Sequence, residues 1–483
     1  MLMLKVLLVV TILLSSLSPA QSIPIAQSDV ERIIGASMTR GGAIDFLETL
    51  SDRIGGRMTG SPESAAAASL ILTTLTDAGL HNAHVEDYPI EAGWKRGQAT
   101  ARVISPVSRP IYIGSYGWAP GTNGPLQAPV VETSMSPRGI LDLSPSQLKG
   151  AAVIVSFNTR TTSYATSYVV LRAKAIRQCA NAGAVAMLIP SDKPHRMLYT
   201  SAYLIYPRAA VPVLSVARED ALFLHRLRKK GPVKLEFDVH NQFTPTAVSE
   251  RNVIAEIPGT GKDIVVVGAH FDSWDWAQGA NDNGSGVAAV IEAARILNSL
   301  GHQPKATIRF ALFSGEEQGC LGSRAYLEAH KAELGHHRMF IFMDGGAQSP
   351  VGIALKGRRD LVQPLTPLIE PLKAIGANHL IPDGEVGSDD ESFIAEGIPA
   401  IELMTEPGEY DINHHAITDT VDKIDARMLS ADTAGIALMA AAVANSDPSP
   451  GRRLQPAEIL QLLNRTHLLE EVRLMRGSNW IPE

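Results

Sequence analysis

The chain has 483 residues, and its composition is that of a globular protein rather than a disordered or nucleic-acid-binding one. Apolar residues make up 45% of it and charged residues 19%, so a substantial core can be buried. The net charge of −7 comes from 43 basic and 50 acidic residues, and no basic run interleaved with aromatic residues indicates nucleic-acid binding. The length favours two large domains or about three smaller ones.

The first residues have the pattern of an export signal. Lys5 precedes the apolar run Val6–Leu14, and Ser18 and Ala20 suit the small-residue positions of a cleavage site. The apolar run is far shorter than the ~20 residues that a membrane-spanning helix needs. We therefore expect residues 1–20 to be a cleaved signal peptide, the protein to be secreted or periplasmic, and no stable membrane span to be present.

The character of the sequence changes twice after this segment. Residues 101–248 hold short β-rich runs and one helical pattern, Tyr168–Ala182, which predicts an inserted β-rich domain. Residues 249–447 alternate apolar runs with helical patterns, which is typical of an α/β domain with a mixed, mostly parallel sheet flanked by helices. We expect residues 21–100 to belong to the same, discontinuous domain.

The elements of this domain are expected from apolar spacing and from helix start and stop signals. The predicted helices are Gly41–Ile54, Ser61–Ala78, Gly286–Leu300, Gly322–Leu334 and Gln363–Ile375, and the predicted strands are residues 252–258, 263–270, 307–314, 339–344 and 399–405. Residues 448–483 form a helical tail whose amphipathic pattern suits either docking on the body of the protein or a homodimer contact. Cys179 and Cys320 fall in different domains, so we expect two free, buried thiols rather than a disulfide.

Metal-binding side chains stand at the ends of the predicted strands. His270 follows the apolar run Ile264–Val267, Glu316 and Glu317 follow another run, and Asp344 follows a third. In α/β sheets, functional groups gather in the crevice beyond the carboxyl ends of the strands. Taken singly, a histidine there is more often structural, and a glutamate pair is more often a solvated face. As an ordered set, these residues indicate a metallohydrolase.

The residue types suit zinc in a catalytic site. The predicted ligands are His270, Asp282, Glu317, Asp344 and His415, a set of imidazoles and carboxylates without thiolates. Five ligands are too many for one catalytic zinc that keeps a position for water, but they suit two zinc ions that share a carboxylate. Glu316 is then left as the general base, and Asp272 can orient the His270 imidazole.

Other residues near these motifs have no single interpretation. Trp274 and Trp276 suit either the wall of a substrate pocket or ordinary packing. His414 competes with His415 for the ligand role. The histidines without a strand-end context are expected on the surface, namely His302, His330, His336, His337 and His379.

At these residues the chain resembles the secreted di-zinc peptidases of the bacterial leucyl aminopeptidase type, and among them the plasma glutamate carboxypeptidase group. The matching segments are IGGRMTGSPES (54–64), WKRG (94–97), HFDSWDWAQGANDNGSG (270–286), FSGEEQGCLGS (313–323), MDGG (343–346) and HHAITDT (414–420). The likeness spans residues from about 30 to 445. It implies a zinc peptidase domain interrupted by a protease-associated insert at 101–248.

The resemblance also implies individual roles. Asp282 would bridge two zinc ions, His270 and Asp344 would complete one site, and Glu317 and His415 the other, with Glu316 as base. His415 is favoured over His414 because it stands four residues before Asp419. A cis peptide after Asp282 is expected, and Asp390 stands where some relatives have histidine.

We therefore expect an exported zinc exopeptidase with two Zn²⁺ ions per chain, in which a zinc-bound hydroxide attacks the N-terminal peptide bond of dipeptides or short peptides with a free N-terminus. Two alternatives remain at this point. One is an inactive, peptidase-like binding or receptor domain, and the other is a different zinc amidohydrolase. No nucleic-acid partner is expected, and a homodimer is compatible with the tail.

Overall fold

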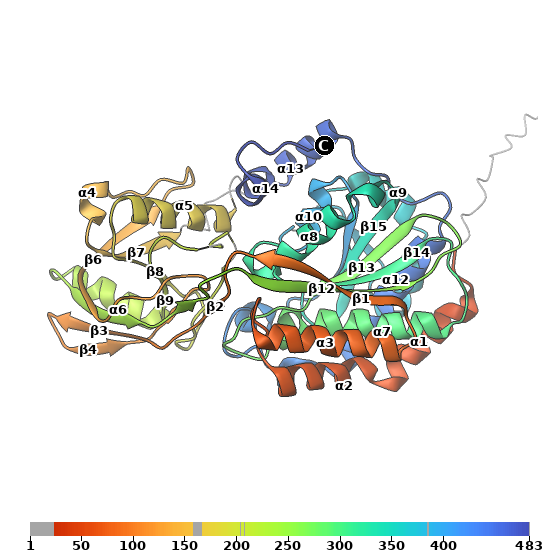
Figure 1. Ribbon diagram of the computed structural model, residues 1–483, viewed down its shortest axis with the longest axis horizontal. Helices are drawn as coiled ribbons and strands as arrows, with labels where there is room; N and C mark the ends of the chain where they lie inside the picture. Colours follow the sequence, from red (N-terminus) through yellow and green to blue (C-terminus); the bar gives the residue numbers. More distant parts are fainter. Residues whose placement is uncertain (1–23, 158–166, 203, 207, 384–385, 483) are drawn as a thin grey trace, which may run out of the picture.

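Two lobes, each built on one eight-stranded sheet, make up the computed structural model (Figure 1). It describes residues 24–157, 167–202, 204–206, 208–383 and 386–482, so the expected signal peptide lies outside the described residues. We call the two parts the large lobe and the insert lobe. The sheet of the insert lobe runs from residue 99 to residue 239, and the large lobe comprises residues on either side of it.

The sheet of the large lobe is mixed, with parallel strands at its centre. Its strands in spatial order are β1 (His81–Ile90), β12 (Val248–Ile257), β14 (Thr307–Phe313), β13 (Ile264–His270), β15 (His337–Phe342), β18 (Ala400–Thr405), β16 (Pro350–Ala354) and β17 (His379–Ile381). The four central strands, β14, β13, β15 and β18, run parallel. The pairs β1–β12, β12–β14 and β16–β18 are antiparallel, and β17 is parallel to β16. This confirms the predicted α/β class, and it brings the carboxyl ends of the central strands to one edge.

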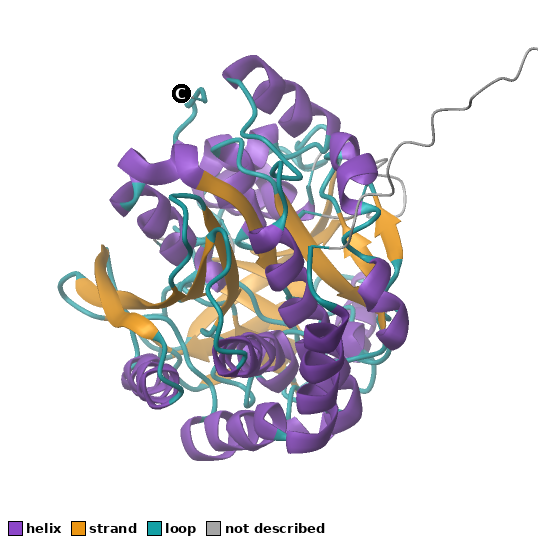
Figure 2. Ribbon diagram, turned by 90° about the vertical axis from the view of Figure 1, so that its right-hand side faces the viewer, coloured by secondary structure: helices purple, strands orange, loops and turns teal. Residues whose placement is uncertain are grey.

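Helices cover both faces of this sheet (Figure 2). One face carries α1 (Gln27–Arg40), α2 (Gly42–Thr49), α3 (Pro62–Asp77), α7 (Ser285–Ser299) and α12 (Ala426–Asn445), and the other carries α8 (Leu321–Ala329), α10 (Asp390–Ala395), α13 (Pro456–Arg465) and α14 (Leu469–Arg476). Among the described residues, α12 is the one helix long and apolar enough to cross a membrane, but 78% of its apolar window is buried inside the protein. It is therefore a core helix of the large lobe.

Local signals explain where several helices begin and end. Ser61 caps α3 by accepting a hydrogen bond from the Ser64 amide at 3.1 Å, as its Ser-Pro-Glu start predicts. The predicted helix Gln363–Ile375 is wrong, because the structure has only the short helices α9 (Val362–Leu365) and η6 (Glu370–Ile375) there. Prolines cause the break, since each removes a backbone donor and clashes with the preceding turn; they are Pro364, Pro367 and Pro371.

The insert lobe is itself an α/β structure. Its strands in spatial order are β4 (Arg109–Ile111), β3 (Ala99–Ser105), β10 (Lys234–Val239), β6 (Leu126–Met135), β7 (Ala152–Phe157), β8 (Ala186–Pro190), β9 (Val213–Val216) and β5 (Ile113–Ser115). Strands β6 to β9 are parallel, and helices α5 (Tyr168–Asn181) and α6 (Arg218–Arg228) pack on opposite faces. The sequence predicts α5 but not α6, so the lobe is less purely β-rich than its short apolar runs indicate.

A two-stranded sheet joins the two lobes, and the tail packs on the large lobe. The chain crosses between the lobes through β2 (Trp94–Lys95) and β11 (Gln242–Phe243), which pair antiparallel as a two-stranded sheet. The tail helices α13 and α14 bury Leu463 and Val472 in the same cluster as Phe340, on the large lobe. The tail therefore docks on the body of its own chain.

Both cysteines are buried thiols that form no disulfide, as expected. Cys179 lies in the core of the insert lobe, where burial raises the pKa of its thiol to about 12. Cys320 lies at the start of α8, where its thiol donates to the carbonyl oxygen of Ser388 at 3.3 Å. Neither thiol is poised to pair with the other.

Candidate metal centre

The predicted ligands meet at the carboxyl edge of the large-lobe sheet. His270 is the last residue of β13, Asp344 stands two residues beyond β15, and Glu316 and Glu317 begin the 3₁₀ turn η3 (Glu316–Gln318) after β14. Because β13 pairs in parallel with both β14 and β15, these three strand ends lie side by side. The geometry thus brings together residues that are up to 74 positions apart in sequence.

Two further ligands come from turns that face this edge. Asp282 lies in the turn η2 (Ala280–Gly284) before α7, and its peptide bond to Asn283 is cis, as the family resemblance implies. The Asn283 side chain is fully buried and donates to the carbonyl oxygen of Met343 at 2.8 Å. His415 follows α11 (Tyr410–Asn413) and has a positive φ of 57°. The Asp419 carboxylate accepts hydrogen bonds from the amides of Asn281 (2.6 Å) and Asp282 (3.1 Å), which fixes the Asp282 turn.

The imidazole of His270 faces two carboxylates. Its Nε2 lies 3.1 Å from Asp344 Oδ1 and 3.3 Å from Asp282 Oδ1, and its Nδ1 lies 3.1 Å from the carbonyl oxygen of Asp272. A carbonyl oxygen can only accept, so Nδ1 carries a hydrogen, and in the neutral imidazole Nε2 is then the nitrogen that offers a lone pair to a metal ion. We call His270, Asp282 and Asp344 the His270 side of the centre.

The imidazole of His415 repeats this arrangement across Asp282. Its Nε2 lies 2.9 Å from Glu317 Oε2 and 3.1 Å from Asp282 Oδ2, and its Nδ1 lies 2.8 Å from the carbonyl oxygen of Thr200. His414 Nε2 is farther from Asp282, at 3.6 Å, so His415 is the better placed of the two neighbours. We call Asp282, Glu317 and His415 the His415 side.

The donor set fits two metal ions that share Asp282. On each side, an imidazole nitrogen and carboxylate oxygens converge on one point, where a metal ion can take the place of the proton that the imidazole holds in the metal-free protein. Asp282 Oδ2 and Glu317 Oε1 are buried and accept no hydrogen bond from the described residues. Nitrogen and oxygen donors of this kind are the ones that Zn²⁺ prefers at catalytic sites, and two-metal sites place the ions about 3.5–4 Å apart.

Glu316 points toward the same space without being needed as a ligand. Its Oε2 lies 4.0 Å from His270 Nε2, and the side chain is buried. Burial raises the pKa of Glu316 well above its ordinary value, and the nearby Asp344 and Glu317 carboxylates add to this effect against the pull of His270. For Glu317, burial raises the pKa to about 7.

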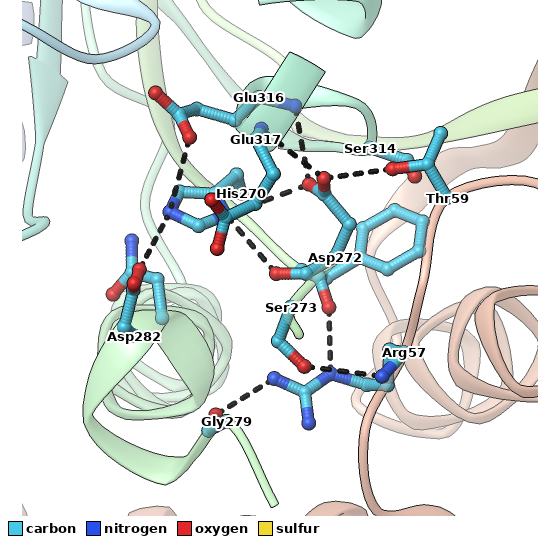
Figure 3. A network of polar contacts seen from close by, with 12 residues as sticks. Arg57, Thr59, His270, Asp272, Ser273, Gly279, Asp282, Ser314, Glu316 and Glu317 are labelled. Atoms are coloured by element: carbon cyan, nitrogen blue, oxygen red, sulfur yellow. Dashed lines mark hydrogen bonds and ion pairs between the residues drawn. The ribbon is translucent and has the colours of Figure 1, made fainter. Parts of the chain in front are cut away.

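Asp272 holds the glutamate pair in place (Figure 3). Its carboxylate accepts hydrogen bonds from the amides of Glu316 (3.2 Å) and Glu317 (3.3 Å) and from the Thr59 hydroxyl (2.9 Å). Its Oδ1 also lies 3.4 Å from His270 Nδ1, although the closer acceptor for that nitrogen is the main-chain carbonyl of Asp272. Asp272 therefore orients His270 mainly through its backbone and orients the glutamates through its side chain.

Arg57 supports the loop between His270 and Asp282 from below (Figure 3). Its fully buried guanidinium donates to four carbonyl oxygens, those of Gly55 (2.9 Å), Phe271 (2.6 Å), Gln278 (2.6 Å) and Gly279 (2.8 Å). Arg57 lies in a motif that carries the family resemblance, but its contacts could not be inferred from the sequence because every acceptor belongs to the main chain.

The two tryptophans near the centre have different roles. Trp274 is buried and meets the His415 ring edge-on at 5.7 Å between centroids, so it packs against a ligand. Trp276 is partly exposed, stacks on the Arg96 guanidinium at 4.4 Å, and helps to line a cavity of about 550 Å³ between the lobes. Trp274 therefore has a packing role, and Trp276 borders a cavity.

Two expectations about neighbouring residues need correction or completion. His337 is not on the surface: it begins β15, is 3% exposed, and pairs through Nε2 with the Tyr326 hydroxyl at 2.8 Å. Asp390 is buried 3.5 Å from the Lys356 ammonium, so it serves an internal ion pair and not the metal centre. The adjacent Asp389 was not singled out from the sequence, yet it is buried, and burial raises its pKa to about 7.

Comparison with known proteins agrees with this geometry. Residues 252–440 match the sequence model of peptidase family M28. Carboxypeptidase Q of Mus musculus is 29% identical over 416 residues, covering 83% of this chain and 85% of that protein. The solved structure of a peptidase M28 precursor from Shewanella amazonensis superposes with a TM-score of 0.78 at 26% identity, covering 89% of this chain and 98% of that one.

A zinc aminopeptidase from Bacillus subtilis shares the fold. Its structure superposes with a TM-score of 0.64 at 22% identity, covering 84% of this chain and 94% of that one. The segments that carry the resemblance seen in the sequence lie at the centre described above or beside it. The match of residues 252–440 to the model of peptidase family M28, the relatives and the geometry of the site agree with one another.

Proposed function

We propose that the chain is an exported zinc exopeptidase that holds two Zn²⁺ ions and removes the N-terminal residue from dipeptides or short peptides. Zinc dependence and peptidase activity are supported by the match of residues 252–440 to peptidase family M28 and by the zinc aminopeptidase that shares the fold. The observation that carries the finer proposal is the pair of imidazole and carboxylate clusters on either side of Asp282, with Glu316 beside them. We further propose that the insert lobe is the protease-associated domain that the resemblance implies.

The roles of the residues follow from their positions. The ligands would be His270 and Asp344 on one side, Glu317 and His415 on the other, and Asp282 between them. When bound there, two zinc ions supply a Lewis acid and make a water molecule acidic near neutral pH. Glu316 takes the proton of the attacking water and passes it to the amine that leaves. The Asp272 carboxylate holds Glu316 in place by accepting a hydrogen bond from the Glu316 main-chain amide.

The neighbouring glutamates allow a sharp test of this assignment. Replacing Glu316 by Gln should lower kcat by a factor on the order of 10²–10⁴ and leave two zinc ions per chain, because it removes the base and no ligand. The matched substitution Glu317→Gln should lower the metal content by one ion per chain. Metal analysis and turnover of the two purified variants separate the roles. Near-normal turnover of the Glu316 variant, or a stable content of one zinc in the parent protein, would contradict the proposal.

The substrate class is tested with a panel of compounds. Dipeptides and aminoacyl nitroanilides should be cleaved, whereas N-acylated analogues should not, because their N-terminus is blocked. Faster cleavage of N-acyl amino acids would instead indicate a different amidohydrolase. Export is tested separately by locating the cleaved N-terminus of the secreted or periplasmic protein by mass spectrometry.

A further inference from the structure

A segment of the insert lobe, residues 193–201, lies against the loop that carries His415. We call it the docking segment. The amide of Thr200 donates to the carbonyl oxygen of His415 at 3.2 Å, and the His415 imidazole donates from Nδ1 to the carbonyl oxygen of Thr200 at 2.8 Å. The Tyr199 ring stacks on the His415 ring with centroids 5.2 Å apart. The buried Lys193 ammonium donates to the carbonyl oxygen of Asp411.

The position of Thr200 is set by the insert lobe and by the crossing between the lobes. Its side-chain hydroxyl donates to the carbonyl oxygen of Ser115, in β5, at 3.3 Å and accepts from Arg96, next to β2, at 3.3 Å. Thr200 is fully buried. The Thr200 carbonyl, which accepts the hydrogen bond from His415 Nδ1, is therefore held in place by residues outside the catalytic edge of the sheet.

The two predicted histidine ligands are oriented by carbonyl groups from different parts of the chain. His270 is oriented by the carbonyl of Asp272, two residues away in the same loop. His415 is oriented by a carbonyl 215 residues away, in the other lobe. The partner of the non-ligating nitrogen fixes the tautomer and the orientation of a metal-binding histidine, and its loss typically lowers metal affinity by about 10–100-fold.

We propose that the insert lobe is a structural part of the His415 side: by holding the Thr200 carbonyl on His415 Nδ1 and the Tyr199 ring on the imidazole, the docking segment sets the metal affinity of that side alone. This rests on the proposed two-metal function. The His270 side keeps its own orienting carbonyl and does not depend on the insert lobe.

The substitution Lys193→Met tests the proposal without touching a ligand. It removes the anchor on Asp411 and should weaken the binding of one zinc ion by about 10–100-fold while the other keeps its affinity, as measured by competition with a chromophoric zinc chelator. Loss of a positive charge would by itself strengthen the binding of a cation, so weaker binding cannot come from the charge. The matched control is Lys174→Met, which removes the ion pair between Lys174 in α5 and Glu470 in α14, and it should leave both affinities unchanged.

A second pair of variants keeps the test independent of the lysine. Tyr199→Ala should reproduce the selective loss of zinc affinity, and Tyr199→Phe should restore it because the ring is kept. In a His415→Ala background, Lys193→Met should have no further effect on the remaining ion, which assigns the loss to the His415 side.

The outcomes also separate this inference from the function on which it rests. A parent protein that binds only one zinc ion would contradict the two-metal function itself. A parent that binds two, with Lys193→Met and Tyr199→Ala leaving both affinities unchanged or lowering both equally, would overturn the role of the insert lobe alone.

Discussion

At the scale of single residues, backbone groups hold the side chains of the candidate metal centre in place. Both imidazoles donate a hydrogen bond from Nδ1 to a main-chain carbonyl. The Asp272 and Asp419 carboxylates each accept hydrogen bonds from two main-chain amides. The side chains that face the metal positions are thereby locked before any ion binds. Such preorganisation lowers the reorganisation that binding requires.

Replacement of Asp272 by Asn tests this locking. An amide group offers one acceptor oxygen where the carboxylate offers two, so the turn that carries Glu316 and Glu317 loses part of its support. We expect zinc affinity to fall by about 10–100-fold and kcat to fall as well. Zinc titration and steady-state kinetics measure the two effects. The control is Thr59→Val, which removes only one donor to the same carboxylate and should change both quantities much less; equal effects of the two variants would contradict this role for Asp272.

At the scale of elements, the tail is held by burial of its apolar face. Leu463 in α13 is fully buried in the cluster that contains Phe340 and Phe393, whereas Gln461 in the same helix is exposed. The two positions let the contribution of this face be measured within one helix.

We expect Leu463→Ala to lower the free energy of unfolding by about 2–5 kcal/mol, because it removes buried methyl groups and leaves a cavity. Gln461→Ala should change the same quantity by less than about 0.5 kcal/mol. Urea denaturation of the two variants measures both. A neutral Leu463→Ala would mean that the tail does not pack on its own chain in solution.

Some elements were predicted from the sequence, and others were missed. Strands β13, β14, β15 and β18 were predicted because each is a continuous apolar run, as strands buried on both faces must be. Helix α12 was missed because it is buried all round, so its sequence lacks a polar face. His270, Glu317 and Asp344 were singled out because strand ends are visible in a sequence, whereas Asp282 and His415 lie in turns and were singled out from their motifs. The role of Thr200 was not, because a main-chain carbonyl has no residue signature.

At the scale of the whole molecule, the centre gathers buried acids whose pKa values are raised. Burial raises the pKa of Glu317 and Asp389 to about 7 and that of Asp419 to about 6. Burial alone would lower the pKa of His270 and His415, but the carboxylates around them raise both well above the ordinary value. The pKa of Asp282 is lowered, because the imidazoles of His270 and His415 outweigh the effect of burial. Burial lowers the pKa of His414.

The metal-free protein should therefore lose stability as the pH rises. A group whose pKa is higher in the folded state stabilises the fold fully below its unfolded pKa, and this contribution disappears as the pH passes the folded value. For the raised carboxyl groups that window runs from about pH 4 to about pH 7. The free energy of unfolding with a chelator present, measured by urea denaturation across this range, should fall with pH, and Glu317→Gln should flatten the slope. Zinc affinity should rise over the same range, because the ligands must be deprotonated. A metal-free protein that gains stability toward pH 7 would contradict this balance.

The burial of Asn283 has a consequence for how the protein can be produced. Asn283-Gly284-Ser285 is an acceptor sequence for N-linked glycosylation, which is added to exported chains in hosts that carry out this modification. The Asn283 side chain is fully buried and donates a hydrogen bond to the carbonyl oxygen of Met343, and it is adjacent to the predicted ligand Asp282, so a sugar on it has no space in this fold. A chain modified there during synthesis cannot complete the metal centre. Active enzyme therefore requires a host that leaves this asparagine unmodified.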